Sequence, residues 1–219
     1  MQKEFIVTDT RAKQKFDRNT VCQRCYRPHE ACFCDTITPL DNRIKIVILQ
    51  HPQEQYKALN SARLCHCLLR NSRIFVGLSW SNFKKVAGPD ALPSEWGVLF
   101  LKPDHHEGNR PLSVINRKKE PVGTASFLRG IVVLDGSWKQ AKALWWRNPW
   151  LLKLNRISLN PGHASLRPQV KQEGLSTIEA IAFALEHLGD NAEIPSQLRT
   201  KYQELILQGK PASGVIVPT

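Results

Sequence analysis

The sequence contains no long apolar run. None of its apolar stretches reaches the ~18 residues of a membrane-spanning helix, and the N-terminal stretch MQKEFIVTDTRAKQKF has no apolar core of the signal-peptide type. We therefore expect a cytoplasmic protein that makes no contact with the membrane. In that reducing compartment structural disulfides are rare and bonds between thiolates and metal ions are favoured.

Acidic residues are also scarce. The chain has 19 Asp and Glu residues against 31 Lys and Arg residues, which gives a net charge of +12. Such an excess suits a polyanionic partner, because each neutralised phosphate releases counterions. A basic protein that is merely soluble, or one that binds acidic lipids, is the alternative. Nucleic acid is favoured because the basic residues alternate with Trp, Tyr and His, which can stack on bases.

Internal repeats and low-complexity tracts are absent, and 219 residues with 42% hydrophobic content predict one large domain with a small appendage. Residues 1–42 read as the appendage, a basic arm followed by a segment with four of the six cysteines and little that could form a core. Residues 43–219 read as the main domain.

Strands and helices alternate along the main domain. Apolar runs predict strands at 43–51, 73–78, 96–101, 130–134 and 155–159. Helical periodicity predicts helices at 54–71, 138–147, from 177 onward and at 195–209. Residues 79–95 and 102–128 read as connections, the second long and polar. This order predicts an α/β fold with a mostly parallel sheet flanked by helices.

Four cysteines gather in the segment CQRCYRPHEACFC, at Cys22, Cys25, Cys32 and Cys34. Four thiolates in so short a stretch can surround one ion, and Zn²⁺ accepts a closed, all-sulfur tetrahedral site. Two disulfides or an iron–sulfur cluster are the alternatives. We predict zinc with a structural role, because a closed site leaves no open position for chemistry.

One strand ends on an acid. In IVVLDGSW, residues 131–138, Asp135 stands at the carboxyl end of the strand, where ligands bind in parallel α/β sheets. Gly136 permits a sharp turn or close ligand approach, and Ser137 can cap the next helix. The alternative is that Asp135 is itself a helix cap.

The helix after Asp135 has two distinct faces. Trp138, Ala141 and Trp145 or Leu144 form its predicted apolar stripe. The other face carries a group of basic and aromatic residues, Lys139, Lys142, Trp146 and Arg147. Such a group can hold phosphates and stack on a base, although a solvated basic face is the simpler interpretation.

Two further segments carry polar residues at helical positions. Ser176 and Glu179 form a predicted capping box, and the N–H groups there can bind a carboxylate or a ribose. Lys57, Asn60 and Ser61 share one face of the predicted helix 54–71, with Arg63 nearby. The alternative for this second group is ordinary surface.

Four blocks of sequence together resemble the DTW-domain family. They are DGSW with the following KQAKAL and NPWL, the cysteine segment, HPQEQYKALNSARL (51–64) and LSTIEAIAFAL (175–185), all in the family's order. The resemblance covers roughly residues 22–190. Ser137 stands where the family usually has Thr, and it keeps the hydroxyl.

The resemblance implies a tRNA-uridine aminocarboxypropyltransferase. Such enzymes move the 3-amino-3-carboxypropyl group of S-adenosylmethionine to N3 of a tRNA uridine, in the variable loop for bacterial members, and release methylthioadenosine. The family is also considered related to SPOUT-type transferases, which implies a possible trefoil knot. A methyltransferase acting on RNA with the same cofactor and a non-catalytic, zinc-bearing RNA-binding module are the alternative functions.

This interpretation assigns roles to individual residues. Asp135 is the expected acceptor of the uridine N3 proton, or else the group that holds the cofactor's ammonium. The residues expected around S-adenosylmethionine are Gly136, Ser137, Trp138, Ser165, Arg167, Leu175, Ser176, Thr177 and Glu179. The residues expected to contact tRNA are Lys57, Asn60, Arg63, Lys139, Lys142, Trp146 and Arg147.

Overall fold

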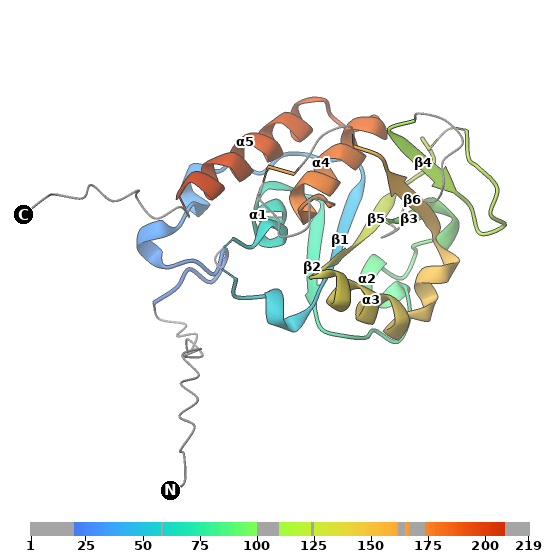
Figure 1. Cartoon of the computed structure of the whole chain (residues 1–219), viewed down its shortest axis with the longest axis horizontal. Helices are drawn as coiled ribbons and strands as arrows, with labels where there is room; N and C mark the ends of the chain where they lie inside the picture. The colour runs from blue at the N-terminus through green and yellow to red at the C-terminus, as the bar shows by residue number, and fades with distance from the viewer. Residues whose placement is uncertain are drawn as a thin grey trace, which may run out of the picture.

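A six-stranded sheet lies at the centre of the computed structural model, which describes residues 20–57, 59–99, 110–123, 125–161, 165–166 and 174–208 (Figure 1). The spatial order of the strands is β2-β1-β5-β3-β6-β4. The strands are β1 (Lys45–Gln50), β2 (Ser72–Val76), β3 (Trp96–Leu99), β4 (Leu112–Ile115), β5 (Gly130–Asp135) and β6 (Asn155–Leu159). All neighbours pair in parallel except β4, which runs antiparallel to β6. The expected mostly parallel sheet is thus confirmed.

Helices cover both faces of the sheet (Figure 1). One face carries α1 (Ser61–Leu68), α4 (Thr177–His187) and α5 (Glu193–Gln208), and the other carries α2 (Lys84–Ala87), α3 (Trp138–Arg147) and the 3₁₀ segment η5 (Pro149–Lys153). Shorter 3₁₀ turns are η1 (His29–Ala31), η2 (Cys34–Thr36), η3 (Pro52–Glu54) and η4 (Pro93–Glu95). Strand side chains alternate between the faces, so Ile131 and Val133 of β5 pack with α1, α4 and α5, whereas Val132 and Leu134 pack with α3.

The segment before α1 differs from the sequence prediction. The helix expected at 54–71 begins only at Ser61, because the Asn60 side chain accepts a hydrogen bond from the Arg63 N–H and caps the helix there. Lys57 and Asn60 therefore precede the helix, and the prediction that they share a helical face with Ser61 was wrong.

The two expected connections also contain regular structure. Strand β4 lies within the stretch predicted as a polar crossing, and helix α2 lies within 79–95. On α3, the buried residues are Ala141 and Leu144. Trp138 is 46% exposed, so its placement on the apolar stripe was wrong.

The cysteine segment packs directly on the main domain. Cys25 and Cys34 are buried in the same apolar core as residues of α1, α4 and α5. An isolated bridge pairs Leu40 with Leu69, immediately after α1. The basic arm predicted before the cysteines lies outside the described residues, apart from its last two positions. Among the described helices, none has both the length and the apolar character required to cross a membrane.

Candidate active site at the carboxyl ends of β1 and β5

Two polar side chains meet where β1 and β5 end. Gln50 and Asp135 are the last residues of their strands and are direct partners in the parallel register. The Gln50 Nε2 donates to Asp135 Oδ2 at 2.8 Å, and the Thr177 hydroxyl at the start of α4 donates to Asp135 Oδ1. Asp135 is only 8% exposed. These contacts show that Asp135 does not cap α3; it joins the sheet to α4.

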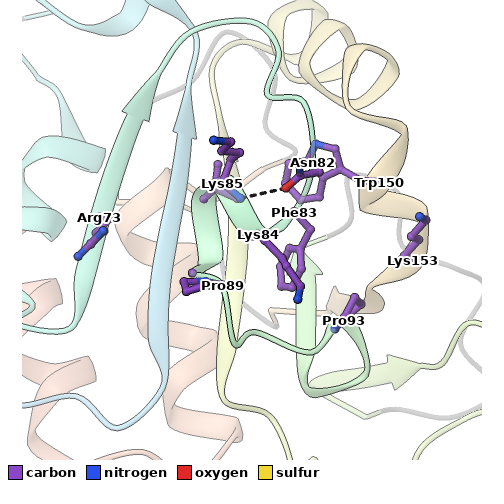
Figure 2. Close-up of a pocket in the computed structure, with 11 residues that line it drawn as sticks. Arg73, Asn82, Phe83, Lys84, Lys85, Pro89, Pro93, Trp150 and Lys153 are labelled. Atoms are coloured by element: carbon purple, nitrogen blue, oxygen red, sulfur yellow. Dashed lines mark hydrogen bonds between the residues drawn. The ribbon is translucent and has the colours of Figure 1, made fainter.

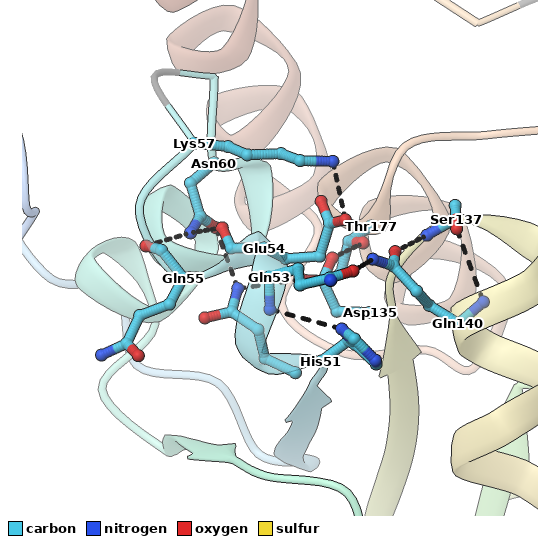
Figure 3. Close-up of polar contacts among 11 residues, drawn as sticks. His51, Gln53, Glu54, Gln55, Lys57, Asn60, Asp135, Ser137, Gln140 and Thr177 are labelled. Atoms are coloured by element: carbon cyan, nitrogen blue, oxygen red, sulfur yellow. Dashed lines mark hydrogen bonds and ion pairs between the residues drawn. The ribbon is translucent and has the colours of Figure 1, made fainter. Parts of the chain in front are cut away.

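The orientation of the Gln50 amide is fixed by its neighbours. Asn60 donates through Nδ2 to the carbonyl oxygens of Glu54 and Gln55, both at 3.0 Å (Figure 3). Its Oδ1 must therefore be the atom that accepts from Gln50 Nε2, at 3.2 Å. Since Nε2 donates to both Asp135 and Asn60, Gln50 Oε1 faces away from them. That buried oxygen has no hydrogen-bond partner within the described part of the chain.

Burial raises the pKa of the Asp135 carboxyl. The hydrogen bonds from Thr177 and Gln50 oppose this rise, as does the charge of Lys57, whereas the charge of Glu54 adds to it. Lys57 and Glu54 form an ion pair at 2.6 Å. The pKa of Asp135 is thus higher in the folded than in the unfolded chain. Its contribution to stability is fully present below the pKa of the unfolded chain and is lost as the pH rises through the pKa of the folded chain. The chain thus accepts a cost in stability to keep an ionisable group here.

The turn from β5 into α3 is held by a capping box. The Ser137 hydroxyl accepts from the Gln140 N–H at 3.4 Å, and Gln140 Oε1 accepts from the Ser137 N–H at 2.6 Å, so the predicted cap at Ser137 is confirmed. Gln140 Nε2 also donates to Gln53 Oε1 at 3.0 Å, which ties α3 to η3. A Cβ on Gly136 would lie 2.8 Å from the Gln140 Cβ. Only glycine allows this close approach.

The carboxylate of Glu179 holds a second turn, at the start of α4. The Ser176 hydroxyl accepts from the Glu179 N–H at 3.5 Å and the carboxylate accepts from the Ser176 N–H at 2.9 Å, which confirms the predicted capping box. The carboxylate accepts from the Ser176 hydroxyl as well, at 2.5 Å. It also accepts from the Ser165 hydroxyl and the Leu166 N–H, both at 2.6 Å. Glu179 is 4% exposed. One buried carboxylate therefore fixes Ser165 and Leu166 against the helix that carries Thr177.

The change Glu179→Gln should lower the melting temperature. The substitution replaces one acceptor oxygen by an amide N–H group that faces other donors. We expect the free energy of unfolding to fall by about 2 kcal/mol, which lowers the melting temperature by roughly 4–8 °C for a chain of this size. Differential scanning calorimetry measures the shift. The matched control is Glu120→Gln, because Glu120 is exposed and accepts from the Asn116 side chain at 2.9 Å. Equal melting temperatures for the two variants would contradict this role of Glu179.

The outer face of α3 is basic and aromatic. Trp146 is 78% exposed, and the expected basic residues Lys139, Lys142 and Arg147 are exposed as well. None of these three cations takes part in an ion pair within the described ranges. Because α3 begins three residues after Asp135, this strip of positive charge and exposed ring surface starts beside the carboxyl cluster.

The four cysteines form a compact group of sulfur atoms. All four Sγ atoms lie within 4.8 Å of one another, and the pairs Cys22–Cys34 and Cys25–Cys32 are both separated by 3.7 Å. Zn–S bonds of about 2.3 Å in a tetrahedron place sulfurs about 3.8 Å apart, whereas a disulfide requires about 2.05 Å. A polynuclear iron–sulfur cluster would also hold its thiolates farther apart, because they bind different iron atoms. The spacing fits a single tetrahedral ion.

The cysteine module contacts α1 through two arginines. The Arg24 Nη2 donates to the Cys67 carbonyl at 3.3 Å. The Arg63 guanidinium carbon lies 4.1 Å from the centre of the Tyr26 ring. Arg63 is buried, so ordinary surface is the wrong interpretation for it. Its backbone N–H bonds Asn60, which in turn contacts Gln50. A short path therefore connects the module to the carboxyl cluster.

The structure brings only some of the predicted site residues together. Asp135, Thr177 and Asn60 join one hydrogen-bond network, and Ser165, Ser176 and Glu179 join another at the same helix start. Leu175 is half-buried next to this second network. Arg167 lies outside the described residues. Sequence reasoning missed Gln50, which the rule that singled out Asp135 could have found, since Gln50 also ends an apolar strand.

Comparisons with known proteins agree with the resemblance of the four sequence blocks to the DTW-domain family. The DTW domain model matches residues 19–208. The chain is 28% identical over 195 residues to a Macaca fascicularis protein named tRNA-uridine aminocarboxypropyltransferase 2, covering 86% of this chain and 63% of that one. A Drosophila melanogaster protein of the same name is 27% identical over 189 residues, covering 83% of this chain and 72% of that one. No solved structure matches the chain. Since the DTW domain extends over most of its length, the chain belongs to the DTW-domain family.

Proposed function

We propose that the protein transfers the 3-amino-3-carboxypropyl group of S-adenosylmethionine to N3 of a uridine in the variable loop of tRNA, in the cytoplasm. The names of the relatives support the reaction class. The observation that carries the proposal is the buried carboxyl of Asp135 at the end of β5, beside a basic and aromatic helix face. Such a face suits RNA, and the end of a parallel strand suits a small ligand.

The proposed reaction requires removal of one proton. A bond forms between uridine N3 and Cγ of the methionine arm, the Cγ–S bond breaks, and its electron pair stays on sulfur in methylthioadenosine. Asp135 accepts the N3 proton. Each of its oxygens accepts one hydrogen bond, so each keeps a further lone pair for this proton. Its raised pKa improves it as a base near neutral pH.

The proposed donor site surrounds the start of α4 and the turn after β5. Ser165 and Ser176 lie on the α4 side, where the Glu179 carboxylate accepts a hydrogen bond from each hydroxyl. Thr177 lies at the same helix start and donates to Asp135. Gly136, Ser137 and Trp138 lie on the β5 side. Leu175 and Arg167 complete the set that we assign to S-adenosylmethionine. Positioning is the main task of such a pocket, because it must present Cγ rather than the methyl group to the nucleophile.

We assign tRNA binding to two groups of residues. The exposed strip on α3, with Lys139, Lys142, Trp146 and Arg147, is placed to hold phosphates and stack on a base. On the other side of the cluster, Lys57 is exposed and Asn60 is half-buried. Arg63 acts through its contact with Tyr26 and its bond to Asn60.

We further propose that the four cysteines bind one structural zinc ion, and that residues 1–42 and 43–219 are the module and the catalytic domain. The donor set consists of four sulfurs at the spacing expected for Zn²⁺. Burial raises the pKa of the Cys25 thiol to about 11 and also raises the pKa of Cys34. A thiolate at these positions therefore needs a cation beside it, which the ion supplies.

We extend the proposal to a SPOUT-like fold with a trefoil knot. The parallel sheet and its covering helices are compatible with such a fold. An experimental structure that traces every connection between the strands would decide between a knotted and an open chain.

A double-label experiment tests the proposed reaction. Purified protein is incubated with tRNA and S-adenosylmethionine that carries one label in the methyl group and another in the aminobutyrate arm. We expect only the aminobutyrate label in the RNA. The methyl label alone would identify an RNA methyltransferase. No label in the RNA, together with no calorimetric binding of S-adenosylmethionine, would identify a non-catalytic RNA-binding module.

A further inference from the structure

A second cationic depression lies away from the carboxyl cluster, on the face of the sheet that α2 and η5 cover. Its volume is about 770 Å³. We name it the basic groove; it is lined by Arg73, Asn82, Phe83, Lys84, Lys85, Val86, Gly88, Pro89, Pro93, Trp150 and Lys153. Figure 2 shows Arg73 on one side and Lys153 on the other, with Lys84 and Lys85 between them. Four of the lining residues are cations and none is an acid.

The cations of the basic groove are free to meet an external anion. Arg73, Lys84, Lys85 and Lys153 are all exposed, and no ion pair in the described residues involves any of them. Beside Lys84 and Lys153, the buried rings of Phe83 and Trp150 pack together with their centroids 5.8 Å apart. Exposed cations without ion-pair partners, next to packed aromatic rings, are the arrangement expected for binding a polyanion.

A nearby lysine, Lys45, adds to the positive charge around the groove. The Lys45 Nζ donates to the Ala87 carbonyl at 2.8 Å, just behind the groove. Burial lowers the pKa of Lys45, and the charge of Arg73 lowers it further. An anion bound in the groove would offset this unfavourable concentration of positive charge.

The basic groove is connected to the proposed active site by α3. This helix starts beside Asp135 and leads into η5, which contributes Trp150 and Lys153 to the groove. The groove lies near the starts of β2, β3 and β6, whereas Asp135 ends β5, and a six-residue strand spans about 20 Å. The exposed cations of α3 therefore lie between Asp135 and the cations of the groove. An RNA strand of several nucleotides can span this distance of about 20 Å.

We propose that the basic groove binds the sugar–phosphate backbone of the same tRNA whose target uridine reaches Asp135. The inference rests on the proposed function, because it takes tRNA to be the substrate. The groove is open and its charges are spread over both sides, which fits an extended strand better than a small anion held by converging groups. Its contribution is to affinity and orientation, not to the chemical step.

A charge-matched pair of variants tests this inference. Lys84→Ala with Lys153→Ala removes two cations from the groove, and Arg199→Ala with Lys201→Ala removes two cations from α5 on the opposite face of the sheet. We expect the groove variant to bind tRNA about tenfold more weakly and to reduce the slope of log K against log salt by roughly 1.5. Its KM for tRNA should rise equally, with kcat at saturating tRNA and S-adenosylmethionine affinity unchanged. The α5 variant should bind tRNA within about twofold of the original protein.

The outcomes separate this inference from the proposed function. Restoring the charge with Lys84→Arg and Lys153→Arg should restore affinity, which excludes a folding defect. Unchanged tRNA affinity in the groove variant, or an equal loss in the α5 variant, would overturn the groove while leaving the transfer reaction intact. Absence of transfer by the original protein would overturn the proposed function, and the binding measurement would still report on the groove.

Discussion

Asp135→Asn should reduce turnover at least 100-fold while the protein remains folded and continues to bind tRNA. The expected loss follows from removal of the proposed general base, because such a group contributes about 10²–10⁴-fold to rate. Stability should not fall, because the variant removes a buried ionisable group whose charged form is unfavourable in the folded state. The new amide oxygen can keep the hydrogen bond from Gln50 Nε2, and the Thr177 hydroxyl can accept one from the new amide nitrogen. We expect the melting temperature to stay within a few degrees of the original value or to rise.

Steady-state kinetics and calorimetry check this prediction together. Asp41→Asn is the matched control, since Asp41 is exposed and pairs with Arg70 at 2.7 Å; it should retain full activity. In the original protein, the rate should decline as the pH falls through a pKa above the ordinary Asp value of about 3.9, because the base must be ionised. Full activity of Asp135→Asn would refute the role of base. Selective loss of S-adenosylmethionine binding would instead show that Asp135 holds the ammonium.

If the four cysteines hold the zinc ion that we propose, its removal should destabilise the whole chain. An ion that binds only the folded state at 1,000 times its Kd contributes about 4 kcal/mol, or roughly 8–16 °C in melting temperature for a chain of this length. Cys25→Ser should produce a loss of this size, because Cys25 is buried in the core shared with α1, α4 and α5. Chelation of the original protein should have the same effect.

Metal analysis and thermal melts measure this prediction. We expect one zinc per chain and a colourless protein after anaerobic purification; stoichiometric iron and sulfide would contradict zinc. Cys65→Ala is the control, since Cys65 is buried outside the sulfur group and should keep the metal at a smaller cost. Turnover should fall along with the metal content, because Tyr26 and Arg63 connect the module to Asn60 and Gln50. Full activity in the metal-free protein would exclude that connection.

The sequence predicted correctly those helices and strands whose own residues form an apolar run or an apolar stripe. The continuous apolar run before Asp135 and the stripe of α4 both became the expected elements. Strand β4 escaped prediction because its four residues are defined by pairing with β6, a long-range contact. The start of α1 was misplaced because the apolar periodicity continues through Tyr56 and Leu59, while the Asn60 cap decides where the helix begins.

Asp135 and Thr177 of the candidate site could be singled out from the sequence, but the hydrogen bonds that connect the site could not. Asp135 and Thr177 each stood out from local signals, at a strand end and a helix start. Their hydrogen bond joins positions 42 apart and depends on how α4 packs across the sheet. Gln50 also ends an apolar strand, but its bond to Asp135 follows from the register that places the two residues side by side.

That register also decides which side of the molecule receives the carboxyl group. Successive side chains of a strand point in opposite directions, so inserting or deleting a single residue within β5 would turn Asp135 away from Thr177 and toward α3. The carboxyl group thus stands at the end of a buried inner strand, and the direction in which it points depends on the number of residues before it in β5.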